Sequence, residues 1–286
     1  MAQSDASLDD LRRRIDEIDD ALHDLLMQRG ELAVRVGRAK GGNDAYIRPG
    51  REAKVLRRLI GRHRGPLPKA VLVRIWREIF AVGTALQSNF AVVVHGGEGR
   101  EGLRALAREH FGVLTPITVR GSVAGVLEAV TDGEATVGVL AMPEPEETDP
   151  WWRRLAREGE RVPRIIARLP FAPPASAQNA EVEALVVGLA PLEATGDDRS
   201  YLALEVEGGI SRSALSRALG KAGFAVVDMK HAPDAGQHDM RLVECEGAVM
   251  ADDERLMVLP EASREAVRQV WVLGCYAAPL SRNALA

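Results

Sequence analysis

The residues best suited to chemistry are six polar side chains in the first third of the chain, several of them on apolar seams of predicted helices. The set combines fixed cations with neutral hydrogen-bonding groups, and it holds neither a nucleophile beside a base nor a pair of carboxylates. Such cations bind carboxylates bidentately and stabilise negative charge that develops in a transition state. The set favours a site for an anionic substrate, formed by Arg12, Arg29, Lys40, Arg51, Glu52 and Gln87.

Spacing along the predicted helices distributes these residues in space. Arg29 and Lys40 are eleven residues apart, so they share one helix face about 17 Å apart along the axis. Arg12 precedes Arg29 by seventeen residues, which turns it about 100° around the helix, toward a different neighbour such as a dimer mate. Arg51 and Glu52 fall in the first turn of a second helix. Singly, each residue also has a structural interpretation, because seam arginines snorkel and helix-end lysines complement the dipole.

Three helices must position these side chains. The first is predicted from Ser7 to Lys40, where two glycines end it. Its apolar residues repeat every three or four positions as a heptad seam, and Arg29 occupies one seam position. Because this helix would be about 50 Å long, we expect two copies to pack as an intertwined dimer. A second helix is predicted from Pro49, where proline suits the first turn, and a third over residues 69–87.

The pattern changes near residue 89, from all-helical to alternating strands and helices. Residues 90–142 predict a βαβαβ arrangement, and a linker is predicted at 172–179. Residues 200–270 predict the order β-α-β-β-α of a ferredoxin-like module, with its last helix at 261–270. We therefore expect a multi-domain chain with an all-α three-helix domain at 1–88, an α/β lobe at 89–178 and an α+β domain at 179–286.

The composition excludes several classes of protein. With 46% hydrophobic and 27% charged residues among 286, the chain is too apolar to be disordered. No apolar run approaches the roughly 18 residues that span a bilayer, and the polar, acidic start lacks the apolar stretch of a secretory signal. Two cysteines, Cys245 and Cys275, suit a reducing cytoplasm rather than a disulfide framework. Neither CxxC nor HExxH occurs, so we expect no metal site.

Charge divides the chain at the same boundary. Residues 1–88 carry 17 Lys and Arg against 12 Asp and Glu, whereas the remainder carries 20 against 29. A basic module attracts small anions or nucleic acid. The basic run Arg51–Arg64 has no interleaved aromatic residues and the chain is acidic overall, so nucleic-acid binding is the third choice among the functions considered.

The first 88 residues resemble the all-helical chorismate mutases, especially those fused to prephenate dehydratase. The resemblance rests on LRRRIDEIDDALHDLLMQRGELAVRVGRAK (11–40), YIRPGREAKVLRRL (46–59) and WREIFAVGTALQ (76–87). It implies that Arg12, reaching into the partner's site, acts with Arg29 and Lys40 on the two carboxylates of chorismate. It also implies that Lys40 and Gln87 bond the ether oxygen, that Glu52 binds the ring hydroxyl and that Arg51 supports the site.

Two positions depart from this family's pattern. Gly83 stands where many relatives have a small hydroxyl residue, one turn before Gln87. Arg48 stands in the loop position where some relatives place an aspartate. The first departure predicts a looser contact with one substrate carboxylate.

The remainder resembles a degenerate prephenate dehydratase followed by an ACT-type domain. FAVVVHGGEGREGLRALAREHFG (90–112) and VLEAVTDGEATVGVLAMPEPE (126–146) resemble the dehydratase, but Arg100 and Gly102 replace its hydroxyl residues. Its Thr-Arg-Phe motif aligns with residues 183–185, which read Glu-Ala-Leu, so we predict that dehydratase activity is absent. VLGCY (272–276) resembles the ACT-type domain, whose amino-acid-binding signatures are altered at 209–212 and 230–233; whether an amino-acid effector binds there stays open.

These observations predict a cytoplasmic chorismate mutase that converts chorismate to prephenate without a cofactor or metal. We expect a homodimer through the N-terminal helices, with neither nucleic acid nor a membrane as partner. The alternative is a regulatory or scaffolding protein, in which the helices serve assembly and the C-terminal part senses an amino acid. The retained polar set favours the enzyme, because a merely structural dimer has little use for Arg29 in an apolar seam.

Overall fold

A computed structural model describes residues 7–39, 47–145, 147, 149–173, 182–232 and 238–285. Lys40 and most of the predicted linker lie outside this part. The helices are α1 (Leu8–Ala39), α2 (Pro49–Arg62), α3 (Lys69–Ala85), α4 (Glu101–Phe111), α5 (Val123–Thr131), α6 (Arg212–Lys221), α7 (Glu254–Ala262) and α8 (Arg282–Leu285), with a short 3₁₀ helix η1 (Trp151–Leu155). None of the described helices is long and apolar enough to cross a membrane.

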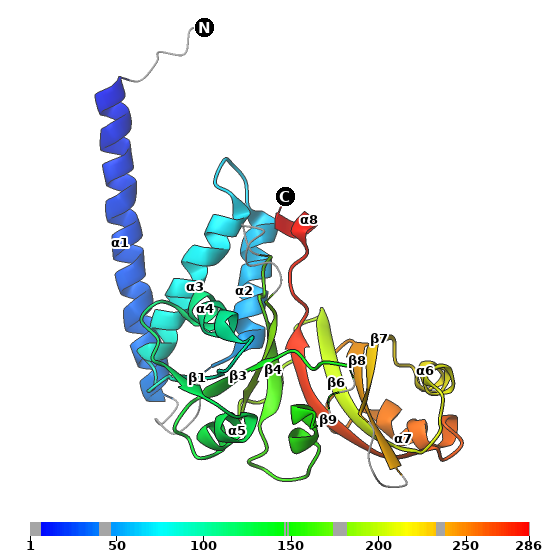
Figure 1. The fold of residues 1–286 in the computed structure, drawn as a ribbon. Helices are drawn as coiled ribbons and strands as arrows, with labels where there is room; N and C mark the ends of the chain where they lie inside the picture. Colours follow the sequence, from blue (N-terminus) through cyan, green and yellow to red (C-terminus); the bar gives the residue numbers. More distant parts are fainter. Residues whose placement is uncertain are drawn as a thin grey trace, which may run out of the picture.

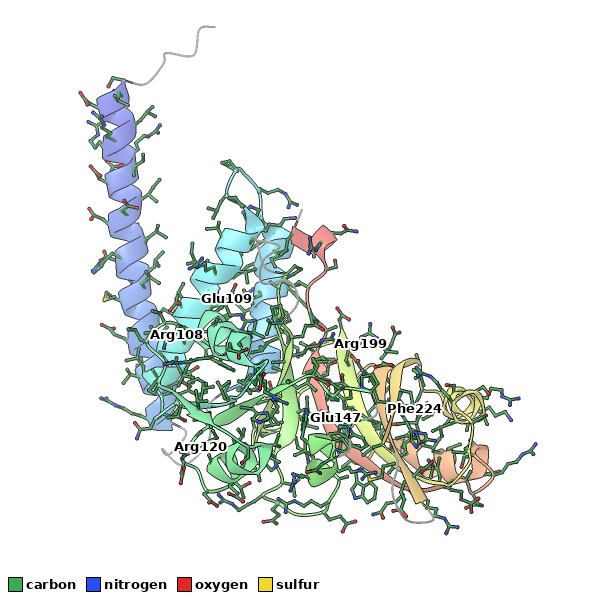
Figure 2. All side chains as sticks on the ribbon, viewed as in Figure 1. Arg108, Glu109, Arg120, Glu147, Arg199 and Phe224 are labelled. Carbon is green, nitrogen blue, oxygen red and sulfur yellow. The ribbon has the colours of Figure 1, made fainter. Side chains whose placement is uncertain are left out.

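The predicted three-helix module is confirmed, and its first helix extends far from the rest of the chain (Figure 1). The C-terminal end of α1 packs against α3, whereas its N-terminal part stands alone as an arm. The seam on this arm is exposed, with Ile15 57%, Ile18 58% and Leu25 60% exposed. Figure 2 shows side chains projecting from this arm on all sides. Such a seam suits the predicted dimer, which stays a prediction.

The described strands form one sheet of nine. They are β1 (Val92–His95), β2 (Ile117–Arg120), β3 (Val137–Ala141), β4 (Arg164–Leu169), β5 (Ala184–Gly188), β6 (Asp198–Glu207), β7 (Val226–Ala232), β8 (His238–Glu246) and β9 (Val267–Ala277). Their order across the sheet is β2-β1-β3-β5-β4-β9-β6-β8-β7. One continuous sheet therefore joins both regions that follow the helical module.

The first half of the sheet contains the predicted βαβαβ arrangement. β1 pairs in parallel with β2 and β3, and α4 and α5 connect these strands. β4 and β5 were not predicted, and β5 pairs antiparallel with both β3 and β4. β5 thus lies in the first half of the sheet, although its residues follow position 178. Trp151 and Trp152, at 4% and 1% exposed, are buried in a core cluster to which strands of both halves of the sheet contribute.

The second half of the sheet runs in the order β9-β6-β8-β7, and its elements follow one another as β-α-β-β-α-β. This is the element order of a ferredoxin-like module, and β9 adds a last strand to the predicted order β-α-β-β-α. The predicted helix at 261–270 is wrong, because α7 ends at Ala262 and β9 begins at Val267. Arg264 and Glu265 have φ of 57° and 59°, and this left-handed backbone stops a right-handed helix.

The helical module shares its core with the sheet region. Leu56, Val73 and Phe80 pack with Phe171, which follows β4, and with Ala277 at the end of β9. The segment after β9 continues along α2 and α3, where Leu280 and Leu285 pack against the same cluster. Residues distant in sequence therefore hold α2 and α3 in place.

Candidate active site

An open pocket of about 660 Å³ lies between α1, α2 and α3. Four of the six predicted site residues line it together: Arg29, Arg51, Glu52 and Gln87. Apolar side chains from all three helices, including Val36, Val55 and Trp76, form the rest of the wall. The structure thus gathers residues that are up to 58 positions apart in sequence around one space.

Arg29 extends from α1 toward α3. Its Nη1 donates to the Ile79 carbonyl at 3.2 Å, and its guanidinium carbon lies 5.9 Å from the centroid of the Phe80 ring. A guanidinium has five N–H donors, so these contacts fix its position and leave donors for a ligand carboxylate. Burial lowers the pKa of Arg29, and the Glu52 carboxylate opposes this shift. Arg29 therefore stays a cation at the pocket.

Glu52 forms a buried ion pair with Arg77 of α3, at 3.0 Å between Arg77 Nη1 and Glu52 Oε2. Burial raises the pKa of the Glu52 carboxyl, and Arg77 and then Arg29 oppose the rise. Arg77 was not among the predicted residues. It lies on the buried stripe of α3 with Val73 and Phe80, and a charged residue on such a stripe is the signal that could have identified it.

Gln87 follows α3 and faces the pocket, and two glycines shape its surroundings. Its Nε2 donates to the Gly83 carbonyl at 2.7 Å, which leaves the second N–H of the amide for a ligand. A Cβ on Gly37 would lie 3.0 Å from Gln87 Cα, so this glycine allows α1 to approach closely. A Cβ on Gly83 would lie 3.2 Å from Arg29 Nη1.

Of the other two predicted residues only Arg12 is described, and it does not line this pocket in the single chain. Arg12 lies on the projecting arm of α1, where its exposed side chain pairs with Asp9 at 3.3 Å. Its predicted role in a partner's site stays a prediction. Lys40 lies outside the described residues.

Arginines dominate the charge of the pocket. Besides Arg29 and Arg51, the lining includes Arg48 and Arg58, against the single carboxylate of Glu52. Arg48 pairs with Glu193, and its Nε donates to Glu193 Oε1 at 2.7 Å. The remaining surplus of positive charge attracts anionic ligands.

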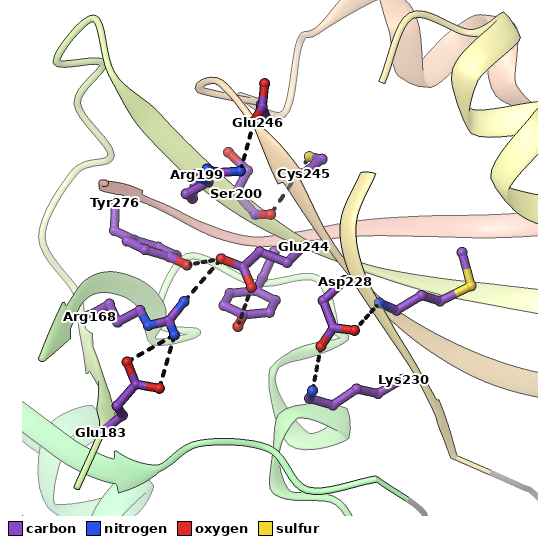
Figure 3. Close-up of polar contacts among 12 residues, drawn as sticks. Arg168, Glu183, Arg199, Ser200, Asp228, Lys230, Glu244, Cys245, Glu246 and Tyr276 are labelled. Carbon is purple, nitrogen blue, oxygen red and sulfur yellow. Dashed lines mark hydrogen bonds and ion pairs between the residues drawn. The ribbon is translucent and has the colours of Figure 1, made fainter. Parts of the chain in front are cut away.

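The region around Glu183, at the position aligned with the dehydratase motif, forms a network of ion pairs and hydrogen bonds. Glu183 pairs with Arg168 of β4 at 3.0 Å (Figure 3). Arg168 also contacts Glu244 of β8 at 3.4 Å. The buried Glu244 carboxylate accepts hydrogen bonds from Tyr201 at 3.1 Å and from Tyr276 at 2.5 Å. Burial and then Glu244 raise the pKa of the Tyr201 phenol, and burial, Tyr201 and Glu244 raise the pKa of the Tyr276 phenol. The Arg168 cation opposes both shifts, and both phenols stay protonated as donors. We call these five residues the sheet network.

The described residues contain no cluster of three or more His, Cys, Asp or Glu side chains that could hold a metal ion. The side chains that line the pocket supply three kinds of chemical group. These are cations for carboxylates, an amide donor, and a carboxylate that can accept from a hydroxyl.

Comparison with known proteins gives a family match over the helical module and several curated relatives that match part of the chain. Residues 11–88 match the family described as chorismate mutase type II. A bifunctional chorismate mutase/prephenate dehydratase from Pseudomonas aeruginosa is 34% identical over 146 residues, covering 49% of this chain and 40% of that protein. One from Neisseria gonorrhoeae is 36% identical over 101 residues, covering 35% and 27%. These matches confirm the predicted resemblance, and the matched part spans less than half the length of these relatives.

One solved structure is similar in fold over the larger part of the chain. A protein described as a novel type of quorum quenching acylase superposes with a TM-score of 0.50 at 20% identity, covering 67% of this chain and 95% of that one. At this identity, the likeness concerns the fold alone.

Proposed function

We propose that this protein is a chorismate mutase, which rearranges chorismate to prephenate. The observation that supports this proposal is the convergence of Arg29, Arg51, Glu52 and Gln87 on one pocket. The pocket lies within the residues that match the type II chorismate mutases. The surplus of arginine around it suits a substrate with two carboxylates.

The reaction breaks a carbon–oxygen bond of an ether and forms a carbon–carbon bond in one pericyclic step. It needs a dianion held in a compact conformer and a donor to the ether oxygen as negative charge develops there. Arg29, with Lys40 and Arg12, would hold the carboxylates, and Gln87, with Lys40, would donate to the ether oxygen. Glu52 would accept from the ring hydroxyl. No proton is transferred and no covalent intermediate forms.

The acting unit in this proposal is a cytoplasmic homodimer. The exposed seam on α1 packs against that of a second copy, and Arg12 of each chain completes the pocket of the other. The exposure of the seam and the position of Arg12 on the arm support this arrangement. The buried free thiols of Cys245 and Cys275 suit a reducing compartment.

The sheet region would have no dehydratase activity. Glu183, at the position aligned with the dehydratase motif, engages Arg168 instead of an open space, which supports this part of the proposal. The ferredoxin-like order of the six elements from β6 to β9 supports an ACT-type domain. Amino acids are the effector class to test there.

The experiment is an assay of purified protein with chorismate. Loss of chorismate absorbance is followed, and acid treatment then converts accumulated prephenate to phenylpyruvate. A parallel sample without acid reports dehydratase activity. We expect chorismate loss and phenylpyruvate only after acid. The rate should be flat between about pH 6 and 8, because the Gln87 amide does not titrate. Absence of chorismate loss would leave the helices as an assembly device and reject the proposal.

A further inference from the structure

The ion pair between Arg77 and Glu52 places a second residue directly behind the pocket. Glu52 lines the pocket, whereas Arg77 is absent from its lining and approaches from the interior, with a side chain only 8% exposed. Arg77 Nη1 binds Glu52 Oε2, so the Oε1 atom of the same carboxylate is left for a ligand in the pocket. The contact thus sets both the orientation and the charge of Glu52.

Arg77 is itself held by the sheet region. Its guanidinium carbon lies 5.2 Å from the centroid of the Phe171 ring, which is only 5% exposed. Phe171 follows β4, and its carbonyl accepts from the Leu280 amide at 2.7 Å, so two segments of the later chain fix its position. Arg57 of α2 approaches the same ring, at 5.9 Å. A cation over an aromatic face is stabilised most where water is excluded.

The charged groups around Glu52 come from every helix packed against it. Arg77 approaches from α3 and Arg29 from α1, while Arg48, Arg51 and Arg58 line the same pocket. His110 of α4 lies near Arg77, and its pKa is lowered well below the ordinary value, first by burial and then by Arg77. His110 is therefore neutral near pH 7, and Arg77 is the direct partner of Glu52.

We propose that Arg77 is a positioning residue that keeps Glu52 ionised and oriented in the pocket, and that Phe171 of the sheet region holds Arg77 in place. This inference rests on the proposed function for its kinetic consequences. A buried carboxyl without its cation protonates at higher pH, because desolvation disfavours its charged form. Loss of Arg77 would then convert the hydroxyl acceptor into a neutral acid and weaken binding of the substrate.

The test compares pH profiles of kcat and KM for the wild-type protein, Arg77→Met and Arg77→Lys. We expect Arg77→Met to lower kcat/KM about tenfold at pH 7, mainly through KM, with a further fall toward pH 6. Arg77→Lys should restore the flat profile in part, because it returns the charge without the planar fork. A lowered but equally flat profile in Arg77→Met would reduce Arg77 to a structural role and overturn the inference.

Phe171→Leu tests the second half of the proposal without removing a charge. Its matched control is Phe224→Leu, because Phe224 is also buried and lies under an arginine, Arg255, at 4.7 Å. Phe224 belongs to the ferredoxin-like part, far from the helical module (Figure 2). We expect Phe171→Leu to shift the acid limb in the direction of Arg77→Met, by less, and Phe224→Leu to leave it in place. Equal profiles for the two leucine variants would remove Phe171 from the proposal.

A measurement without substrate separates this inference from the proposed function. Carbon-13 NMR of protein labelled at the glutamate carboxyl carbons follows the titration of Glu52, which the spectrum of Glu52→Gln assigns. The Glu52 signal should titrate at higher pH in Arg77→Met or, if that variant does not fold, in Phe171→Leu. An unchanged titration overturns the inference. A wild-type protein without mutase activity would reject the proposed function while this titration still decides the role of Arg77.

Discussion

The pocket between α1, α2 and α3 and the sheet network both combine arginine with glutamate, but the two regions differ in what surrounds these charges. Around the pocket, four arginines and one glutamate face an open space of about 660 Å³. In the sheet network, Arg168 lies between two glutamates, and Glu244 also accepts from two tyrosines. The pocket keeps a surplus of arginine over carboxylate around open space even though Arg48 pairs with Glu193, whereas the network pairs both of its carboxylates with Arg168. A surplus of positive charge around an open space therefore identifies the candidate site better than the mere presence of arginine and glutamate.

This difference has a physical basis in desolvation. A buried charge is tolerated when partners of the chain itself compensate it, and removing one partner is then strongly destabilising. A charge that lines an open pocket keeps part of its hydration until a ligand arrives, so its removal affects binding and catalysis more than folding. Substitutions in the two regions should thus separate activity from stability.

The largest expected effect is on catalysis, from Arg29→Ala. We expect kcat/KM to fall about 100-fold to 1,000-fold, because a cation that stabilises transition-state charge is lost, while helical content by circular dichroism is retained. The control is Arg35→Ala, an exposed arginine of α1 that does not line the pocket. Unfolding of Arg29→Ala would assign Arg29 a structural role and erase the contrast between the two regions.

The next effect is on stability, from Glu244→Ala in the sheet network. We expect the free energy of unfolding in urea to fall by about 3 kcal/mol, because Arg168 and both tyrosines lose a buried acceptor. Mutase activity of the folded fraction should stay at the wild-type level. Glu246→Ala serves as the control, since its exposed pair with Arg199 at 3.1 Å should contribute at most about 1 kcal/mol. Equal losses in the two variants would contradict a structural role for the network.

A smaller effect is expected at Gly83, where the pair Gly83→Ser and Gly83→Ala isolates one hydroxyl. Both variants add a Cβ near Arg29 Nη1, at 3.2 Å, which the flexible end of the arginine can accommodate. The serine hydroxyl adds a donor toward the pocket, so KM for chorismate should be about 2-fold to 10-fold lower in the serine variant than in the alanine variant. Identical KM values would mean that no substrate carboxylate approaches this position.

The smallest effect concerns the two thiols within the sheet. Burial raises the pKa of Cys275 to about 11 and that of Cys245 to about 12, so both are protonated in the folded protein at pH 8. We expect little alkylation by iodoacetamide at pH 8 until urea unfolds the chain. Since both folded-state pKa values are raised, the stability they contribute is full below about pH 9 and is lost as pH rises through 11 to 12. Rapid alkylation of folded protein would show that the sheet interior opens readily.

Local pattern predicted much of the fold. The proline at the first turn of α2 indicated where that helix begins, and the βαβαβ order predicted for residues 90–142 is found in β1 to β3 with α4 and α5. β4 and β5 were missed because short buried runs have no period that separates strand from helix. The helix predicted at 261–270 failed because nothing in the apolar spacing reports the left-handed backbone of Arg264 and Glu265.

The candidate site was also predicted only in part, because helix periodicity indicates the face on which a residue lies but not its contacts with distant parts of the chain. Arg29 and Glu52 stand on helices whose faces follow from spacing, and Gln87 comes two residues after the end of α3, so their convergence could be anticipated. Arg77 acts from the interior, and its role depends on Phe171, 94 positions away. Contacts of this kind arise from the packing of one region on another, which the periodicity of a single helix does not encode.

The core that the helical module shares with the sheet region also limits which recombinants of the two parts would fold well. Phe80 and Val73 pack with Phe171, and Leu280 and Leu285 cover the same cluster from the end of the described chain. Recombination near residue 88 would join helices to a sheet region that had not adapted to them, and the mismatched pair would leave apolar surface uncovered. Substitutions on the two sides of this core are therefore expected to compensate one another, and exchange of either part alone should be poorly tolerated.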